Sequence, residues 1–260
     1  MSKNTAETWH QDFYDDLFAQ HCLQRSDKEV NEAVDFLMDK LSLKAGMRFF
    51  DQGCGLGTLS LALARKGLHV TGVDLIDSYI TRAQAEAAAE NLACDFHTGN
   101  AYDFTPSKPC DAAINWWTSF GYSENDDKNI LMMQRIFETL KPGGFFGFDY
   151  KNGARVLKDF AQSNTLRDVA EKDGHKTVWE SRYEPDTNMV YKDWIYTAPD
   201  GTHQENKGGG AKLYTAEDIT HLLTGAGFVN IKFYGDMQGG AFDPDTSIRC
   251  ITISEKPAGA

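Results

Sequence analysis

The chain lacks the segments that would direct it into a membrane or out of the cell. Its longest apolar runs, such as residues 145–148, are only a few residues long, whereas a membrane-spanning helix needs about 20. Residues 1–16 are polar and acidic, without the basic and then apolar order of a signal peptide. These absences predict a cytoplasmic protein with no membrane partner.

Cysteines are few and scattered. The count of five is odd, no C-x-x-C pair occurs, and no H-E-x-x-H or similar ligand spacing appears among the histidines. The pattern is typical of reduced cytosolic thiols and predicts neither disulfides nor a metal site. The five are Cys22, Cys54, Cys94, Cys110 and Cys250.

Basic residues are outnumbered. Lys and Arg total 26 against 38 Asp and Glu, which gives a net charge of −12. Such a chain repels phosphate backbones, and no basic run offsets this, so no nucleic-acid partner is expected. With 260 residues, 41% hydrophobic and 25% charged, the composition is that of a globular protein. The length suits one domain with an insertion.

Most of the chain alternates between strand and helix patterns. The region 9–44 is expected to be mainly helical, with Ser26 and Glu29 forming a capping box. Repeated β–α units predict a parallel sheet with helices on both faces. Strands are predicted at 48–51, 69–74, 94–98, 110–116, 145–150, 229–234 and 249–255, and helices at 58–66, 78–91, 127–140 and 216–224.

Residues 151–213 interrupt this alternation. Three strand patterns, at 176–183, 189–198 and 201–207, are separated by Pro-Asp turn signals, and the glycines at 208–210 suggest a turn back to the main sheet. We expect an antiparallel β insertion that caps the substrate. The chain would then divide into a core with N-terminal lid helices (1–150), the insertion (151–213) and the rest of the core (214–260).

One motif predicts a ligand. A strand leads into Gly53, Gly55 and Gly57 and then into a helix, so the backbone can turn sharply and a ligand can approach free N–H groups. Asp74 follows 17 residues after Gly57, at the end of the next strand, where a carboxylate can accept from ribose hydroxyls. A nucleoside-bearing cofactor is therefore expected. A dinucleotide site would place its third glycine at Thr58, which argues against NAD.

Further segments follow in a familiar order: FFDQGCGLGTLSLALARKG (49–67), VTGVDL (70–75), GNAYDF (99–104), CDAAINWWTSFGY (110–122), LKPGGFFGFDY (140–150) and YTAEDITHLLTGAGFVNIKFYGD (214–236). Together they resemble the class I S-adenosylmethionine-dependent methyltransferases, specifically bacterial small-molecule methyltransferases. The resemblance covers most of residues 45–150 and resumes at 214–256. It implies an α/β, Rossmann-like seven-stranded sheet, S-adenosyl-L-methionine as cofactor, and methyl transfer to N or O of a small-molecule acceptor.

The resemblance also implies roles for individual residues. Cofactor contacts are expected from Asp51, Gly53, Cys54, Gly55, Gly57, Asp74, Leu75, Asn100, Ala101, Asn115, Trp116 and, in the lid, Tyr14. Substrate contacts are expected from Trp117, Phe120, Tyr122, Tyr150, Tyr214 and Arg249, with Lys151 a further candidate near a strand end. No catalytic base stands out, and the candidates are His10, His203 and Tyr150.

Two other functions stay open at this point. An NAD-type oxidoreductase would need a proton-donor site, and a non-catalytic S-adenosylmethionine-binding module would need no substrate cavity. Nucleic-acid methylation is rejected, because Pro109-Cys110 precedes the fourth strand and Asn115-Trp116-Trp117 lacks the prolines of the amino-methylating enzymes. The expected partner is a small molecule, with a homodimer left open.

Overall fold

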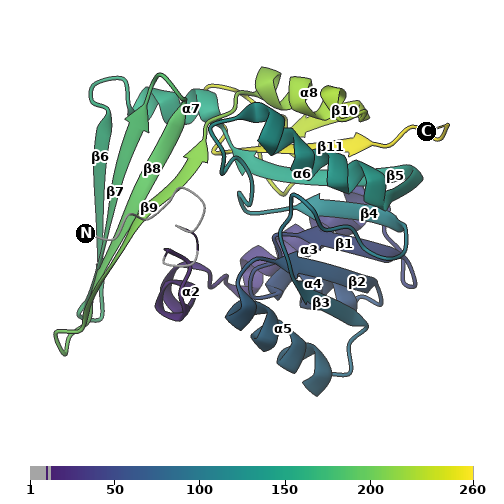
Figure 1. The fold of residues 1–260 in the computed structure, drawn as a ribbon, viewed down its shortest axis with the longest axis horizontal. Coiled ribbons are helices and arrows are strands. Elements are labelled where there is room, and N and C mark those ends of the chain that lie inside the picture. Colours follow the sequence, from purple (N-terminus) through teal and green to yellow (C-terminus); the bar gives the residue numbers. More distant parts are fainter. Residues whose placement is uncertain (1–9, 11–12, 260) are drawn as a thin grey trace.

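The computed structural model describes residue 10 and residues 13–259. Its main sheet has seven strands in the order β10-β11-β5-β4-β1-β2-β3 (Figure 1). Strands β1 to β5 are mutually parallel, β11 runs antiparallel to β5, and β10 runs antiparallel to β11, which confirms the predicted fold class. The strands are β1 (Arg48–Gln52), β2 (His69–Asp74), β3 (Cys94–Thr98), β4 (Cys110–Asn115), β5 (Leu140–Lys151), β10 (Val229–Tyr234) and β11 (Arg249–Glu255).

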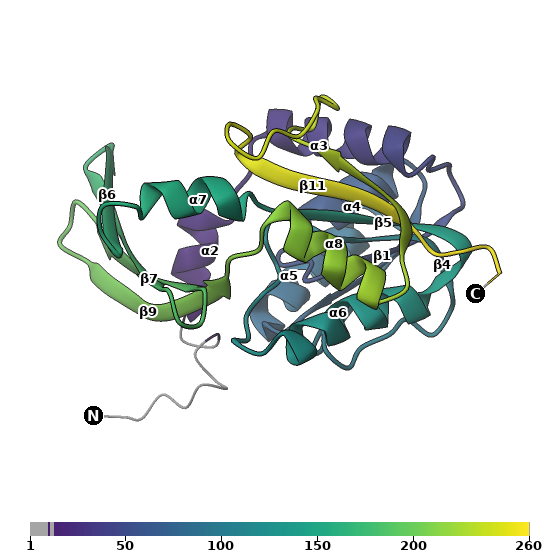
Figure 2. The same ribbon diagram turned by 90° about the horizontal axis from the view of Figure 1, so that it is seen from above.

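Helices cover both faces of this sheet because successive strand residues point to opposite sides. Phe49 packs in the core on the α3 and α4 side, whereas Phe50 packs with the α6 and α8 side (Figure 2). Among the described helices, none combines the length and hydrophobicity of a membrane crossing. The helices that cover the main sheet are α3 (Asp27–Lys40), α4 (Thr58–Arg65), α5 (Asp77–Ala89), α6 (Asp126–Thr139) and α8 (Ala216–Gly225).

Helix starts follow the sequence signals. The Ser26–Glu29 capping box is formed at α3, and Thr215 with Asp218 forms a second at α8. Each box satisfies two backbone donors that a helix end otherwise leaves unpaired. Helix α4 instead begins at Gly57 in the left-handed conformation with no side-chain cap, so its first N–H groups are not taken by a capping side chain.

The chain order reverses between β1 and β4. Strand β1 pairs with β2 on one side and β4 on the other, both parallel. Ligands of open α/β sheets bind at the carboxyl ends of the strands at such a point, because the loops there diverge and leave a crevice. The glycine loop, the end of β2 and the end of β4 meet at this place.

A second, four-stranded antiparallel sheet stands beside the core, in the order β6-β7-β8-β9 (Figure 1). It follows directly from β5 through helix α7 (Gly153–Asp159), and β9 leads into α8. Its strands are β6 (Thr165–Lys172), β7 (His175–Glu184), β8 (Met189–Thr197) and β9 (His203–Lys212).

Two local expectations for this insertion were wrong. Strand β6 was missed, because TLRDVAEK is an almost wholly exposed, charged edge strand without apolar alternation. The glycines at 208–210 lie within β9 and form no turn. Gly208 (φ +82°) sits where the register shifts against β8, and a Cβ at Gly209 would come within 2.6 Å of the Phe13 ring. Glycine is required there by a bulge and by close packing.

Helix α2 (Asp16–Cys22) lies between the core and the insertion sheet (Figures 1 and 2). Phe18 packs edge-on against Trp179 and Trp194 of that sheet. Just before α2, the carbonyl of Asp15 accepts a hydrogen bond from Tyr79 of α5 at 3.0 Å, and its carboxylate accepts one from Asn206 of β9 at 3.0 Å. The N-terminal segment is therefore tied to both units.

Asn206 should control how firmly this segment is held. Its Nδ2 donates to the carbonyl of Phe13 at 2.8 Å as well as to Asp15, and the residue is 2% exposed. Replacing Asn206 with Ala removes both hydrogen bonds, at a cost of about 1.5–3 kcal/mol for the one to the charged carboxylate. We expect faster amide exchange across residues 13–22, measured by hydrogen–deuterium exchange. Exchange at the level of the unaltered protein would contradict this tie.

Candidate functional site

The glycine loop is held against β2 and leaves one open position. The N–H groups of Gly53 and Cys54 both donate to the carbonyl of Val73, at 2.8 and 3.0 Å. All three glycines have positive φ, of +77°, +54° and +74°. A Cβ on Gly53 would meet Ser119 at 2.7 Å and one on Gly57 would meet Ala83 at 2.9 Å, but one on Gly55 would meet nothing within 4 Å. Gly55 therefore borders space into which a ligand can come.

Alanine at these positions should separate folding from binding. Gly55→Ala should cost little beyond its left-handed backbone, about 1 kcal/mol, while its methyl group occupies the ligand's space and weakens cofactor binding at least tenfold. Gly57→Ala adds a collision with Ala83 and should lower the melting temperature more. Calorimetry with S-adenosylhomocysteine and thermal unfolding measure the two effects. Equal cofactor affinity for Gly55→Ala and the unaltered protein would show that no ligand passes there.

Two carboxylates flank this loop, with Asp51 buried and Asp74 half-buried. The Asp74 carboxylate accepts from the N–H of Gly55 at 2.8 Å and from the N–H of Ile76 at 3.0 Å, and burial raises its pKa. Asp51 is 3% exposed and accepts from Ser60 at 2.7 Å. Burial, followed by the charge of Asp74, raises the pKa of Asp51 to about 7. Two such carboxylates favour a ligand that carries positive charge.

The end of β4 presents an unused acceptor. Nδ2 of Asn115 donates to Oε1 of Gln52 at 3.1 Å and to the carbonyl of Ser119 at 2.9 Å. Its Oδ1 is buried and has no hydrogen-bond partner among the described residues. Because an unpaired buried acceptor is costly, this oxygen suits a ligand that donates to it.

The next residue departs from its expected role. Trp116 was expected to contact the cofactor, but its ring is 3% exposed and packs beside Phe36 of α3 in the core. The strand alternation that aims Asn115 at one side of the sheet turns Trp116 to the other. The carbonyl of Trp116 instead accepts from Ser119 Oγ at 3.2 Å, so its local contribution is to the shape of the loop.

The loop after β4 has an unusual backbone. Trp117 and Thr118 are both left-handed, with φ of +53° and +70°, which is costly for residues other than glycine. Asp149 of β5 holds them: its carboxylate accepts from the N–H of Trp117 at 3.1 Å and its carbonyl accepts from that of Thr118 at 3.2 Å. Arg249 bonds Asp149 at 2.7 Å and Thr118 Oγ1 at 3.0 Å. A rigid scaffold thus fixes this loop over the strand ends.

The expected adenine-binding turn lies beyond β3. Oδ1 of Asn100 accepts from the N–H of Tyr102 at 3.0 Å, which shapes the turn and leaves one lone pair of this oxygen. The carbonyl of Ala101 accepts from Gln52 at 3.2 Å. Leu75, directly after Asp74, is 41% exposed. An exposed apolar side chain beside a polar turn is a surface that a flat base can cover.

The N-terminal segment reaches this site. A side-chain hydrogen bond joins Tyr14 to Tyr122, and both lie near Asp74. Burial raises the pKa of Tyr14 to about 12, so its hydroxyl stays protonated and can donate at neutral pH. The structure therefore brings Tyr14 and Tyr122 to the cofactor side.

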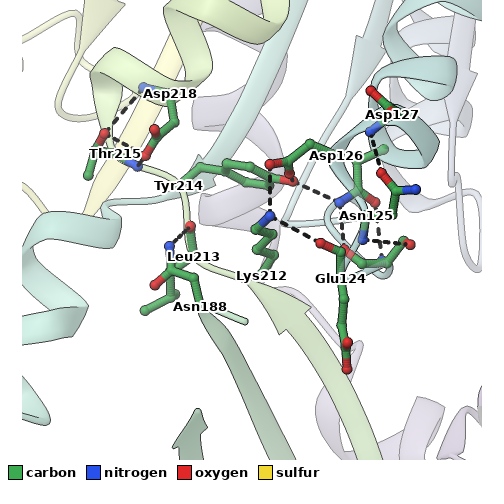
Figure 3. Close-up of polar contacts among 12 residues, drawn as sticks. Glu124, Asn125, Asp126, Asp127, Asn188, Lys212, Leu213, Tyr214, Thr215 and Asp218 are labelled. Atoms are coloured by element: carbon green, nitrogen blue, oxygen red, sulfur yellow. Dashed lines mark hydrogen bonds and ion pairs between the residues drawn. The ribbon is translucent and has the colours of Figure 1, made fainter. Parts of the chain in front are cut away.

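Three residues expected to contact substrate, Phe120, Tyr150 and Tyr214, are instead buried in the core. The Tyr150 hydroxyl lies 2.6 Å from the carbonyl of Lys212, and Phe120 is buried beside it in the core. The Tyr214 hydroxyl donates to Asp126 at 2.6 Å and accepts from Asn129 at 2.7 Å (Figure 3). Since the Tyr150 hydroxyl is bonded to backbone and is fully buried, it does not have the access that a catalytic base needs.

The two histidine candidates occupy different places. His203 begins β9 at the hairpin end away from the core, exposed, with Thr197 Oγ1 at 3.0 Å; the length of β9 puts it about 30 Å from the junction at Lys212. This position does not support catalysis. The carbonyl of His10 accepts from the N–H of Tyr14 at 3.0 Å, which keeps His10 near the cofactor side.

Other site residues escaped prediction. Ser119 links the β4 loop to the carbonyl of Gly53 at 3.3 Å, Asp149 holds the same loop, and Arg25 lies over the Trp117 ring at 5.1 Å. Asp149 could have been predicted, because it follows the apolar run of β5 and charged residues are rarely buried unless they are paired. Arg25 had no local signal, since only tertiary contact brings it there.

Known proteins share this arrangement. Residues 49–144 match the family model described as a methyltransferase domain. The chain is 36% identical over 125 residues to the S-adenosyl-L-methionine-dependent Diels-Alderase iccD of Talaromyces variabilis, covering 46% of this chain and 41% of that protein. It is 32% identical over 131 residues to a putative methyltransferase of Geobacillus sp. (strain WCH70), covering 47% and 53%. The chain thus spans about half the length of these relatives.

The fold is shared along the whole chain. The structure of the CcbJ methyltransferase from Streptomyces caelestis superposes with a TM-score of 0.80 at 18% identity, covering 98% of this chain and 100% of that one. The domain match falls on β1 to the start of β5, which carry the glycine loop, Asp74 and Asn115. Residues 49–144 thus match a methyltransferase domain, on a Rossmann-like fold that the chain shares with solved S-adenosylmethionine-dependent methyltransferases.

Proposed function

We propose that the protein transfers a methyl group from S-adenosyl-L-methionine to a nitrogen or oxygen atom of a small-molecule acceptor. The observation that carries the proposal is that three features able to bind a ligand lie together at the carboxyl ends of the central strands. These are the open position at Gly55, the half-buried carboxylate of Asp74, and the unpaired Oδ1 of Asn115. The residues fit a cationic, ribose-bearing cofactor.

Each of these residues has a definite task. Asp74 would accept from the ribose hydroxyls, the loop of Gly53 and Gly55 would enclose the methionine part, and Asn100 with Leu75 would border the adenine. The cofactor supplies a methyl group on a positively charged sulfur, so the leaving group is a neutral sulfide. The chain's own work is to align the acceptor, which can lower a barrier by about 7–11 kcal/mol.

The elements around the site favour alignment over acid–base chemistry. Arg249 and Asp149 fix Trp117 and Thr118, and Tyr14 with Tyr122 closes the side facing α2. An uncharged amine acceptor needs no base before attack, whereas a hydroxyl acceptor does. We therefore favour an amine nitrogen as the acceptor atom.

A second function has one observation in its favour. The relative from Talaromyces variabilis is named as a cofactor-dependent Diels-Alderase, which suggests that this domain can bind the cofactor and promote another reaction. Binding without consumption of the cofactor would indicate that function, or a non-catalytic module, in this chain as well.

Calorimetry with S-adenosylmethionine, S-adenosylhomocysteine, NAD and NADP tests the cofactor. We expect micromolar binding of the first two and none of the dinucleotides. A coupled assay for S-adenosylhomocysteine release, run over a panel of small amines and phenols, tests transfer. Release that depends on one acceptor supports the proposal. NAD binding, or cofactor binding with no release for any nucleophile, would overturn it.

A further inference from the structure

Positively charged side chains gather where β5, β11 and the insertion sheet meet. Lys151 ends β5 and stands directly opposite Arg249 in the antiparallel pairing with β11. Side chains so paired lie about 5 Å apart at Cβ, and like charges there are destabilising. The protein therefore keeps an unfavourable pair of cations beside its proposed active site, in a chain whose net charge is −12.

A third cation comes from the insertion. Lys192 of β8 is partly buried, and its Nζ lies 5.5 Å from the centre of the Trp179 ring. It pairs in register with Ser181 and shares a face of the sheet with Trp194, and Trp194 packs on α2. That face is turned toward the core, so Lys192 and Lys151 approach each other and repel.

Few carboxylates balance this cluster. Asp149 is already bonded to Arg249, at 2.6 Å between Oδ2 and Nη2. Asp168, the carboxylate that attracts Lys192, is exposed on β6 and forms no ion pair with the residues that the structure describes. The Lys151 ammonium group has neither an ion pair nor a hydrogen bond to any residue that the structure describes. Burial, then the charges of Lys192 and Arg249, lowers the pKa of Lys151 to about 7.

Arg25 completes the group from the connection between α2 and α3. It is partly buried over the Trp117 ring, and it is attracted by Glu29 and Asp149 and repelled by Arg249. The cations thus come from four separate segments, and two of them, Arg25 and Arg249, contact the residues that follow β4. A structural role would pair such charges, because an uncompensated buried charge is costly.

We infer that Lys151 and Lys192 bind an anionic group of the methyl acceptor, a carboxylate or a phosphoryl group, and thereby orient the acceptor in the active site. This inference rests on the proposed function. An anion placed between the two ammonium groups would relieve their repulsion and would make charge-assisted hydrogen bonds. The acceptor would enter with its anionic end toward the insertion sheet and its nucleophile toward Trp117.

The test uses three probes of similar shape on the protein saturated with S-adenosylhomocysteine. Phenylacetate carries a carboxylate, phenyl phosphate carries a phosphoryl group, and phenylacetamide is neutral. We expect calorimetry to show at least one anion binding ten times more tightly than the amide. Whichever anion binds more tightly identifies the source of the charge.

Two variants and one control locate the effect. Lys151→Met and Lys192→Met should each weaken anion binding about tenfold and leave S-adenosylhomocysteine binding unchanged. Lys176→Met, which removes an equal charge from an exposed lysine paired with Glu171 at 3.2 Å, should change neither. Because Lys192 lies on a different sheet from Lys151, it keeps the test valid if the Lys151 variant fails to fold.

A pH series adds an independent readout. The ammonium form of Lys151 binds the anion, so affinity should fall as pH rises from 6 to 9 through the lysine pKa. Lys151→Met should flatten this dependence. The other charged groups near the site, Lys192, Arg249, Arg25, Asp149 and Asp168, are unchanged in this variant. Anions that bind no better than phenylacetamide, or as well to both variants as to the unaltered protein, would overturn the inference. A failure of S-adenosylhomocysteine itself to bind would count against the proposed function instead.

Discussion

Replacing Asp74 with Ala should weaken binding of S-adenosylmethionine and S-adenosylhomocysteine at least 100-fold. The carboxylate is positioned by the N–H groups of Gly55 and Ile76, and its remaining lone pairs would accept from two ribose hydroxyls. Each hydrogen bond to a charged group contributes about 1.5–3 kcal/mol. Two such bonds correspond to a loss of about 3–6 kcal/mol, and tenfold in affinity corresponds to about 1.4 kcal/mol.

The variants Asp74→Asn and Asp77→Ala sharpen this experiment. Asp74→Asn keeps one acceptor oxygen and should give an intermediate affinity. Asp77 is three residues away and bonds Thr98 Oγ1 at 2.8 Å on the exposed side of α5, so Asp77→Ala should bind the cofactor normally. Calorimetry measures all three. If the Asp74→Ala protein bound the cofactor with an affinity within threefold of that of the unaltered protein, Asp74 would not be the residue that binds the ribose.

Replacing Asp149 with Ala should both destabilise the fold and disable the site. The substitution leaves Arg249 without its counterion and the N–H of Trp117 without its acceptor. Removing one partner of a buried pair costs about 3–5 kcal/mol, although Arg249 is partly exposed, which favours the lower figure. The unpaired N–H of Trp117 adds about 1–2 kcal/mol, while release of the left-handed Trp117 and Thr118 returns about 1 kcal/mol for each residue. We therefore expect a net loss of about 2–3 kcal/mol in the free energy of unfolding.

The effect on binding should exceed the effect on stability. The loop of Trp117 reaches the glycine loop through Ser119 and the carbonyl of Gly53, so its relaxation disturbs both. Denaturant unfolding and cofactor calorimetry should be compared for Asp149→Ala, Asp149→Asn, which keeps an acceptor without the charge, and Asp39→Ala, an exposed control beside Lys40. A variant that is less stable but binds cofactor fully would show that the strained loop is not needed for binding.

Prediction from the sequence succeeded where the signal was local. Periodicity located the strands of the parallel sheet and the helices between them, and the capping boxes at Ser26 and Thr215 fixed two helix starts. The glycine loop and Asp74 were recognisable because their spacing is set by one strand–turn–helix unit. These features need only neighbouring residues, so the sequence carries them fully.

Prediction was weaker where distant segments meet. Trp116 and Trp117 are adjacent, yet one ring lies in the core and the other under Arg25, because strand alternation ends between them in a left-handed loop. Tyr150 and Tyr214 stand near strand ends as expected, but their hydroxyls bond the junction with the insertion. The edge strand β6 has no apolar face, so its sequence shows no alternation of apolar and polar residues from which a strand could be predicted.

The sequence by itself determined the class of fold and the cofactor loop, since hydrophobic periodicity and a glycine turn are encoded within short windows. Tertiary structure alone decided which charges gather beside the proposed active site. Arg25, Lys151, Lys192 and Arg249 are spread over 225 positions of the chain, and only the docking of the insertion and of α2 on the core brings their charges together. Electrostatic repulsion acts through space, so no local pattern in the chain can show it.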